Sequence, residues 1–261
     1  MTTFLTLGLC SLLTLSDGAP AERLEAVCES LASAPSATFE MNLLPLGRME
    51  EVRSTNGRIS QIGIGGGTPQ RLVIRRETGK PEHLRLDDAE VFRFPGGLLV
   101  GRLGEGNWAV CVAPPDADDC GVKGFTVDDG STALDRLVFA ARSVPFPAAL
   151  MAQVRDEIRE AESEVEGGET VLRAALNGHS TGNSTLASAR SSDDRDVDEN
   201  SSVTAHLRSN GSVASISVGR SVRHGSARGG MVGFWAHTFE PSAIGSTRVD
   251  VPPEVTALAG K

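Results

Sequence analysis

The chain has 261 residues, a formal net charge of −9 at pH 7, and a hydrophobic fraction of 39%. This length allows one large domain or two small ones, and all-β architectures of this size often form a single unit. Only 4% of the residues are aromatic and Tyr is absent, so the base-stacking platform of a nucleic-acid-binding protein is not expected. The negative net charge also repels phosphate backbones, which excludes nucleic acid as the expected partner.

The first 21 residues have the pattern of an export signal. Residues 4–15 form an apolar run that is too short to cross a bilayer as a mature helix. Ala19-Pro20-Ala21 then supplies the small residues that a signal peptidase accepts, although no Lys or Arg precedes the apolar run. We therefore expect a signal peptide over 1–21, export to the periplasm or cell envelope, and a single domain over 22–261. The alternative is an ordinary buried helix at the N-terminus.

The cysteines indicate one disulfide candidate. Cys111 and Cys120 bracket a short loop rich in Pro and Asp, which can bring two thiols within bonding range. In an exported protein this pair is expected to be oxidised. Cys28 is predicted to be a small buried hydrophobe on the apolar face of a helix. The absence of a Cys-x-x-Cys motif excludes zinc-ribbon and thioredoxin-like sites.

The domain is predicted to begin with a helix that leads into strands. Residues 24, 27, 28 and 31 are apolar at helical spacing, which predicts an amphipathic helix that ends near Ala34-Pro35. From Ala37 onwards apolar and polar residues alternate, as in a half-buried strand. Apolar runs then recur, divided by turn signals such as Asn56-Gly57, which predicts an antiparallel meander. These runs lie at 59–64, 72–74, 84–86, 91–94 and 108–112.

Two helices and a second group of strands are expected in the remainder. One short helix is predicted over 134–141, and a second after Pro147 carries Ile158 and Ala161 on its apolar side and ends at Gly167-Gly168. Residues 178–202 are rich in Ser, Asp, Asn and Thr, which predicts a long, mobile, acidic loop. The strands are predicted at 170–175, 203–207, 213–218 and 234–239, with Asn210-Gly211 as a hairpin turn.

The motifs that carry chemistry are incomplete. The glycine cluster 63–68 has neither the third Gly of a dinucleotide fingerprint nor the Gly-Lys of a P-loop. The acidic alternation at 194–198 has Glu199 where a calcium loop needs Gly. No two histidines stand three or four residues apart, and no Gly-x-Ser-x-Gly elbow occurs. We therefore expect no catalytic residues, no metal site and no cofactor.

The order of the parts resembles that of periplasmic lipoprotein carriers of the LolA type and of the related LppX/LprG-like glycolipid-binding lipoproteins. Three stretches, under half of the chain, carry the resemblance: the helix and strand over 22–43, the consecutive strands within 82–112, and the aromatic strand and closing segment over 234–258. In that family a short N-terminal helix leads into a strongly curved sheet. Helices inserted mid-chain plug its concave side and enclose an apolar cavity.

The resemblance implies an α+β, β-dominated fold, in which a half barrel of antiparallel strands has short helices packed across its concave face. It also implies a monomeric, non-enzymatic, extracytoplasmic binder of a lipid or acylated ligand. The inward-facing positions that would line the cavity are Phe39, Met41, Leu84, Leu86, Phe92, Phe94, Trp108, Val110, Leu150, Val154 and Ile158.

Three alternatives stay open at this point. In the first alternative, the listed side chains fill one another's space as an ordinary core. Pattern alone does not distinguish a filled barrel from a hollow one. The chain is a cell-envelope interaction or regulatory module without a ligand, resembling the domain that restrains anti-sigma-factor cleavage, and another envelope protein is then its partner. A third alternative is a secreted hydrolase whose Ser/His/Asp site assembles from distant positions.

Overall fold

The computed structural model describes residues 18–43, 49–53, 59–63, 69–111, 132–177, 201–224 and 231–260. Several expectations concern residues outside these ranges. They include most of the predicted signal peptide, the Asn56-Gly57 turn, Cys120 and nearly all of the predicted acidic loop.

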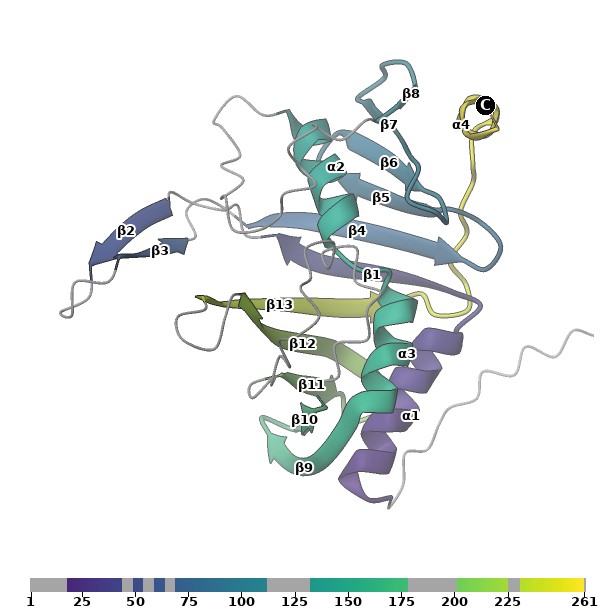
Figure 1. Cartoon of the computed structure of the whole chain (residues 1–261). Helices are drawn as coiled ribbons and strands as arrows, with labels where there is room; N and C mark the ends of the chain where they lie inside the picture. The colour runs from purple at the N-terminus through teal and green to yellow at the C-terminus, as the bar shows by residue number, and fades with distance from the viewer. Residues whose placement is uncertain are drawn as a thin grey trace, which may run out of the picture.

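Eleven strands form one antiparallel sheet whose two edges do not meet, and β2 pairs with β3 apart from it. The strand order is β8-β7-β6-β5-β4-β1-β13-β12-β11-β10-β9. Strand β1 therefore joins the two halves of the chain, because it pairs with β4 on one side and β13 on the other (Figure 1). The strands are β1 Ser36–Leu43, β2 Met49–Arg53, β3 Ile59–Gly63, β4 Gln70–Glu77, β5 Glu82–Leu86, β6 Ala89–Arg93, β7 Leu99–Leu103, β8 Ala109–Val110, β9 Ile158–Glu166, β10 Glu169–Leu176, β11 Ser202–Leu207, β12 Val213–His224 and β13 Met231–Ser242.

The described helices are short. They are α1 Pro20–Ser33, α2 Ala133–Ser143, α3 Pro147–Glu157 and α4 Pro253–Ala259. Helix α2 packs against β5, β6 and β7, whereas α1 packs against α3, β9 and β10. Figure 1 shows α2 and α3 in front of the sheet, with α1 beside α3. The fold is thus α+β and β-dominated, as predicted.

Local sequence explains where the helices begin and end. Helix α1 has Pro20 at its first position, where the missing N–H costs nothing, and it ends just before Pro35. Its buried residues are the four predicted at helical spacing, Leu24, Val27, Cys28 and Leu31. Helix α2 begins with a capping box, in which Thr132 Oγ1 accepts from the Asp135 N–H and the Asp135 carboxylate accepts from the Thr132 N–H.

The predicted second helix is too long. It was expected to reach Gly167-Gly168, but α3 ends at Glu157 and the chain continues as β9, so the helical placement of Ile158 and Ala161 is wrong. Residues 158–166 include four Glu, one Ala and one Arg, which favour helix when considered alone. In the fold they pair along β10, and the ladder hydrogen bonds and cross-strand charge pairs override that local propensity.

Two apolar clusters form on opposite faces of the sheet. The larger lies between the sheet and helices α1 to α3, and the smaller lies under the C-terminal segment. Strand β6 contributes to both, because successive side chains point to opposite faces: Val91 belongs to the larger cluster and Phe92 to the smaller. We call them the helix-facing cluster and the C-terminal cluster.

Candidate functional site

Six of the predicted cavity-lining residues meet in the helix-facing cluster. They come from the N-terminal strand, the meander and the second mid-chain helix, which lie far apart in sequence. Each is 5% exposed or less, and Ile158 packs against the cluster from the start of β9. These six are Phe39, Met41, Leu84, Leu86, Leu150 and Val154.

The other four predicted residues lie elsewhere. Phe92, Phe94 and Trp108 belong to the C-terminal cluster on the opposite face, and Val110 is 42% exposed on the edge strand β8. Their assignment to one inner surface with Leu84 and Leu86 is therefore corrected. In β6 the inward positions are Val91 and Arg93, since Phe92 points to the other face.

A buried ion pair lies within the apolar layer beneath α2. The side chains of Arg93 on β6 and Glu82 on β5 are 4% and 6% exposed. Arg93 donates from Nε and Nη2 to the same oxygen of Glu82, at 3.0 and 2.5 Å. Its Nη1 donates to the backbone carbonyls of Ala141 and Val144, at 2.7 and 2.5 Å.

Arg93 therefore fixes the end of α2 to the sheet. Its guanidinium also lies 3.8 Å from the centre of the Phe146 ring, in the elbow between α2 and α3. Burial raises the pKa of Glu82, and the positive charge of Arg93 opposes that rise. We call Arg93, Glu82 and their carbonyl partners the elbow latch.

A second buried ion pair marks the point where α3 becomes β9. Arg220 on β12 and Glu157, the last residue of α3, are 2.5 Å apart with side chains 9% and 8% exposed. Gln153 donates to the other oxygen of Glu157 at 2.9 Å. The pair connects the helix layer to β12 in one half of the sheet, as the elbow latch connects it to β5 and β6 in the other half.

The opposite face carries a ring stack beside an open groove of about 640 Å³. The rings of His83 and Phe92 are stacked with their centroids 4.6 Å apart, and the centroids of the Phe92 and Trp108 rings are 5.4 Å apart. The Arg102 Cζ atom lies 4.5 Å from the centroid of the Trp108 ring, and Glu254 of α4 also lines the groove. Burial lowers the pKa of His83, although nearby Glu90 works against that shift.

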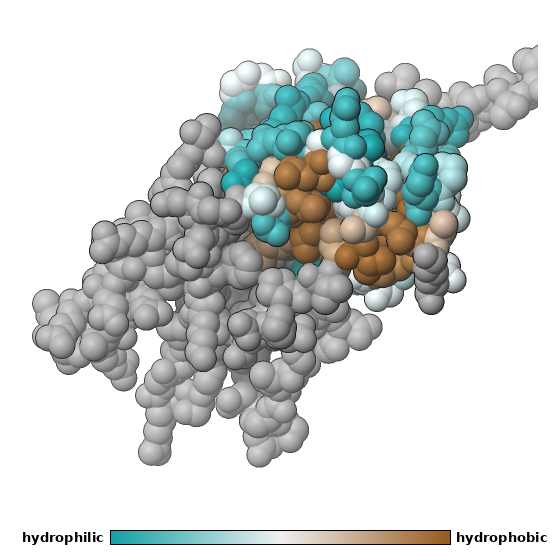
Figure 2. Space-filling model, turned by 90° about the horizontal axis from the view of Figure 1, so that it is seen from above, coloured by the Kyte–Doolittle hydropathy of each residue, from teal (hydrophilic) through white to brown (hydrophobic). Residues whose placement is uncertain are grey.

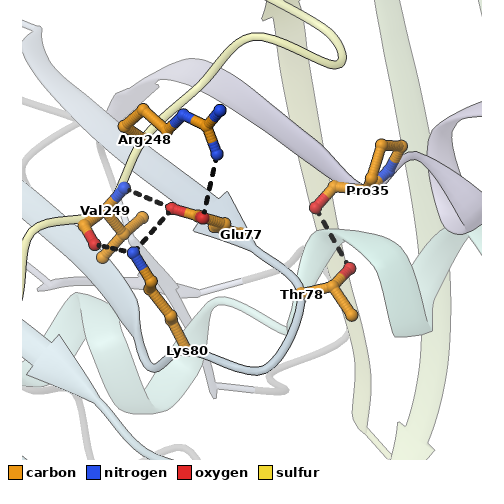
Figure 3. Close-up of polar contacts among 6 residues, drawn as sticks. All are labelled: Pro35, Glu77, Thr78, Lys80, Arg248 and Val249. Carbon is orange, nitrogen blue, oxygen red and sulfur yellow. Dashed lines mark hydrogen bonds and ion pairs between the residues drawn. The ribbon is translucent and has the colours of Figure 1, made fainter. Parts of the chain in front are cut away.

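The C-terminal segment is held across this face by the contacts drawn in Figure 3. Glu77, at the end of β4, accepts from the Val249 N–H at 2.8 Å and pairs with Lys80 at 3.1 Å. Lys80 in turn donates to the Val249 carbonyl at 2.7 Å, and Arg248 lies 3.4 Å from the Glu77 carboxylate. Beyond these contacts the chain continues to α4, whose Val255 is buried in the C-terminal cluster. We call this set the strap clamp.

Among the residues that the structure describes, no group of three or more His, Cys, Asp or Glu side chains could hold a metal ion. Cys111 is not bonded to the other described cysteine, Cys28, and its proposed partner Cys120 lies outside the described residues, so that disulfide stays a prediction. Burial raises the pKa of Cys28 to about 12, which leaves it an inert thiol.

Sequence reasoning missed the charges of the two buried ion pairs. Arg93 stands in the apolar run Val91–Phe94, and a charge at an inward strand position is a signal that could have found it. Glu82 carries the same signal, because it alternates with the buried residues Leu84 and Leu86. Arg220 carries it too, because it alternates with Ile216 and Val218 on β12.

One described segment is long and apolar enough to cross a membrane by length and composition. Within Ala133–Glu157, which comprises α2, the elbow and α3, an 18-residue window has a mean hydropathy of 1.4, and half of that window is buried inside the fold. Buried core helices of soluble proteins have the same length and composition. Figure 2 shows the molecule from above, with apolar residues at the surface among hydrophilic ones.

No protein-family model matches the chain, and no curated protein matches it either.

Proposed function

We propose that this protein binds or carries a lipid or another hydrophobic ligand outside the cytoplasm, between the helix layer and the sheet. The observation that carries the proposal is the helix-facing cluster, in which three distant segments contribute apolar side chains to a single layer. The layer reaches from β7 at one end of the sheet to β10 near the other. A long acyl chain can bind in such an extended apolar layer without a polar partner.

The free energy of such binding comes from the hydrophobic effect. Each buried methylene of an acyl chain contributes about 0.8 kcal/mol, so two long chains are held firmly without a specific polar contact. The side chains of the layer fill one another's space when no ligand is bound, with Leu84 and Leu86 fully buried. Uptake of a ligand therefore requires the helices to move away from the sheet.

The elbow latch supports this requirement. Arg93 joins the end of α2 to the sheet through two carbonyls. Near the start of α2, Arg136 Nη2 lies 3.7 Å from the Asp87 carboxylate, and the buried contact between these two points is apolar. A polar latch of this kind defines one closed position for the helix layer. We propose that the latch opens when the ligand enters, and that the open sheet bends as a half barrel around the ligand, as the resemblance to LolA-like carriers implies.

A direct binding assay tests the proposal. Purified protein is titrated with a fluorescent long-chain fatty acid, and native mass spectrometry of the protein from the envelope fraction detects bound lipid. We expect saturable uptake and an adduct that organic solvent removes. The variant Met41→Gln keeps the volume of a residue that is 5% exposed but places an amide in the apolar layer, so affinity falls about tenfold.

The matched control is Val165→Gln, because Val165 is 76% exposed on the outer strand β9. This control should bind the fatty acid as the wild type does, and thermal unfolding should show that both variants fold. A wild-type protein that takes up no fatty acid and carries no adduct would contradict the proposal. Equal affinity of Met41→Gln and the wild type would place the ligand elsewhere.

A further inference from the structure

The sheet has one edge at β8 and the other at β9. Strand β8 has two residues in the described part of the chain, and the residues that follow Cys111 lie outside the described ranges. Strand β9 at the other edge has nine residues, Ile158–Glu166, and no described strand pairs with its outer side. A long unpaired edge presents a row of N–H and C=O groups on which a further strand can form.

The side chains of β9 decide what kind of strand fits. Glu162, Glu164 and Glu166 lie on one face, opposite Arg173, Val171 and Glu169 of β10. Arg173 pairs with Glu164 and Glu166, so this face keeps an excess of negative charge. On the other face Val165 is 76% exposed, the largest exposure among the exposed large hydrophobic residues of the described chain.

These charges argue against a second copy of the chain as the occupant. Antiparallel pairing of β9 with its own copy would set the Glu row of one strand beside the Glu row of the other, and like charges on neighbouring strands repel. A strand with Lys or Arg at alternate positions would meet opposite charges instead. Its intervening apolar residues would cover Val165.

We propose that β9 accepts an extended segment of a partner protein as an added strand, and that this segment alternates Lys or Arg with apolar residues. Backbone hydrogen bonds along the edge hold the segment, and the two faces of β9 select its side chains. The inference does not rest on lipid binding, since Glu162, Glu164 and Val165 are exposed and lie outside the helix-facing cluster.

The test uses the full chain and a nine-residue labelled peptide in which Lys alternates with Val. Fluorescence anisotropy should show saturable binding, and hydrogen exchange should show new protection of the β9 amides. A second peptide carries an N-methyl group on every backbone nitrogen, so it keeps every charge but cannot donate backbone hydrogen bonds from either edge. We expect this peptide not to bind. Equal binding of both peptides, or no binding of the first, would overturn the proposal.

Charge reversal supplies the matched variants. The double variant Glu162→Lys with Glu164→Lys should weaken the binding of the Lys peptide about tenfold. It should instead favour the binding of a peptide with Glu in place of Lys. The control Glu105→Lys with Glu254→Lys makes the same change in net charge near the short edge strand β8. Equal weakening by both double variants would show that the peptide responds only to net charge, and would refute a site on β9.

Discussion

The buried charge of Arg93 is balanced by Glu82 and by helix carbonyls that lie in an otherwise apolar layer. A buried ion pair adds little net stability relative to apolar residues of the same size, but loss of one partner is costly because the other charge stays buried and unpaired. The value of such a pair lies in geometry, since it allows only one position of the elbow on the sheet.

Removal of Arg93 alone should therefore destabilise the fold strongly. We expect Arg93→Met to lower the free energy of unfolding by about 3–5 kcal/mol, measured by urea denaturation. Glu82→Leu added to Arg93→Met should recover a large part of that loss, because no buried charge then remains. The control Arg71→Met removes a surface pair with Glu40, in which Arg71 is 67% exposed, and should cost about 1 kcal/mol or less. Similar losses for Arg93→Met and Arg71→Met would contradict the buried latch.

His237 on β13 should make stability depend on pH. Burial lowers the pKa of His237 to about 4, from 6.5 for a free side chain. The unfolded chain therefore binds a proton between these two values while the folded chain does not, so stability is lost as the pH falls from 6.5 towards 4. The loss assigned to this residue reaches about 3 kcal/mol at the lower value.

The variant His237→Gln tests this link. We expect its free energy of unfolding to fall less steeply than that of the wild type between pH 6.5 and 4, the two limits set by the pKa of His237. A residual slope should persist, because burial also lowers the pKa of His83. Identical slopes for the variant and the wild type would show that His237 titrates alike in the folded and unfolded chain.

At the scale of the elements, the C-terminal segment depends on a few polar contacts near its start. The strap clamp precedes α4, a helix of seven residues that is too short to be stable alone. Its position therefore depends on the clamp at Glu77 and on the burial of Val255. The same arrangement shapes the groove between α4 and Trp108.

Glu77→Gln should loosen this segment without unfolding the sheet. We expect faster amide hydrogen exchange over 247–259 in the variant, whereas Glu240→Gln, an exposed change on β13, should leave that exchange unaltered. Hydrogen bonding from Val249, with Lys80 next, lowers the pKa of Glu77 from 4.5. The clamp is thus fully formed above pH 4.5 and is lost as the pH falls through the lower folded value. Exchange over 247–259 that stays slow in Glu77→Gln would show that the clamp is dispensable.

The boundary between α3 and β9 shows how far local pattern reaches. Helical spacing continues through Ile158 and Ala161, and the Glu-rich sequence beyond them favours helix. The helix nevertheless ends where Glu157 meets Arg220 of β12, a residue more than sixty positions away. A contact of that sequence separation leaves no periodic signal in a short window.

For the whole molecule, the two apolar clusters make the sheet a middle layer that is covered on both faces. Helices cover one face, and the C-terminal segment covers part of the other over Phe92 and Val100. Loss of that segment would expose apolar surface on β6 and β7.

A chain truncated after Ser246 should therefore be less stable and more prone to aggregate. Val249 and Val255 are fully buried, and each contributes about 1.5–3 kcal/mol on burial, so the midpoint of thermal unfolding should fall clearly. A control truncated after Ala259 keeps both valines and should unfold at the wild-type temperature. Equal unfolding temperatures for the two truncated chains would show that the C-terminal cluster adds nothing.

The sequence by itself determined the elements whose period agrees with their burial. Helix α1, strand β1 and the hairpin at Asn210-Gly211 follow from local spacing and turn chemistry, and Gly211 has the positive φ of 79° that the turn needs. Leu84, Leu86, Leu150 and Val154 were likewise recognisable as apolar positions of a strand and a helix, and all four are buried. Such features depend on neighbours within a few positions.

Only the tertiary structure decided which face each apolar residue occupies and where the charges are buried. Phe92 and Val91 are equally apolar, and their opposite directions depend on the register of β6 against β5 and β7. Arg93 is paired because β5 sets Glu82 beside it and α2 ends above it. The physical reason is that register, helix placement and ion pairing are long-range contacts, which the chain specifies only once the whole sheet has formed.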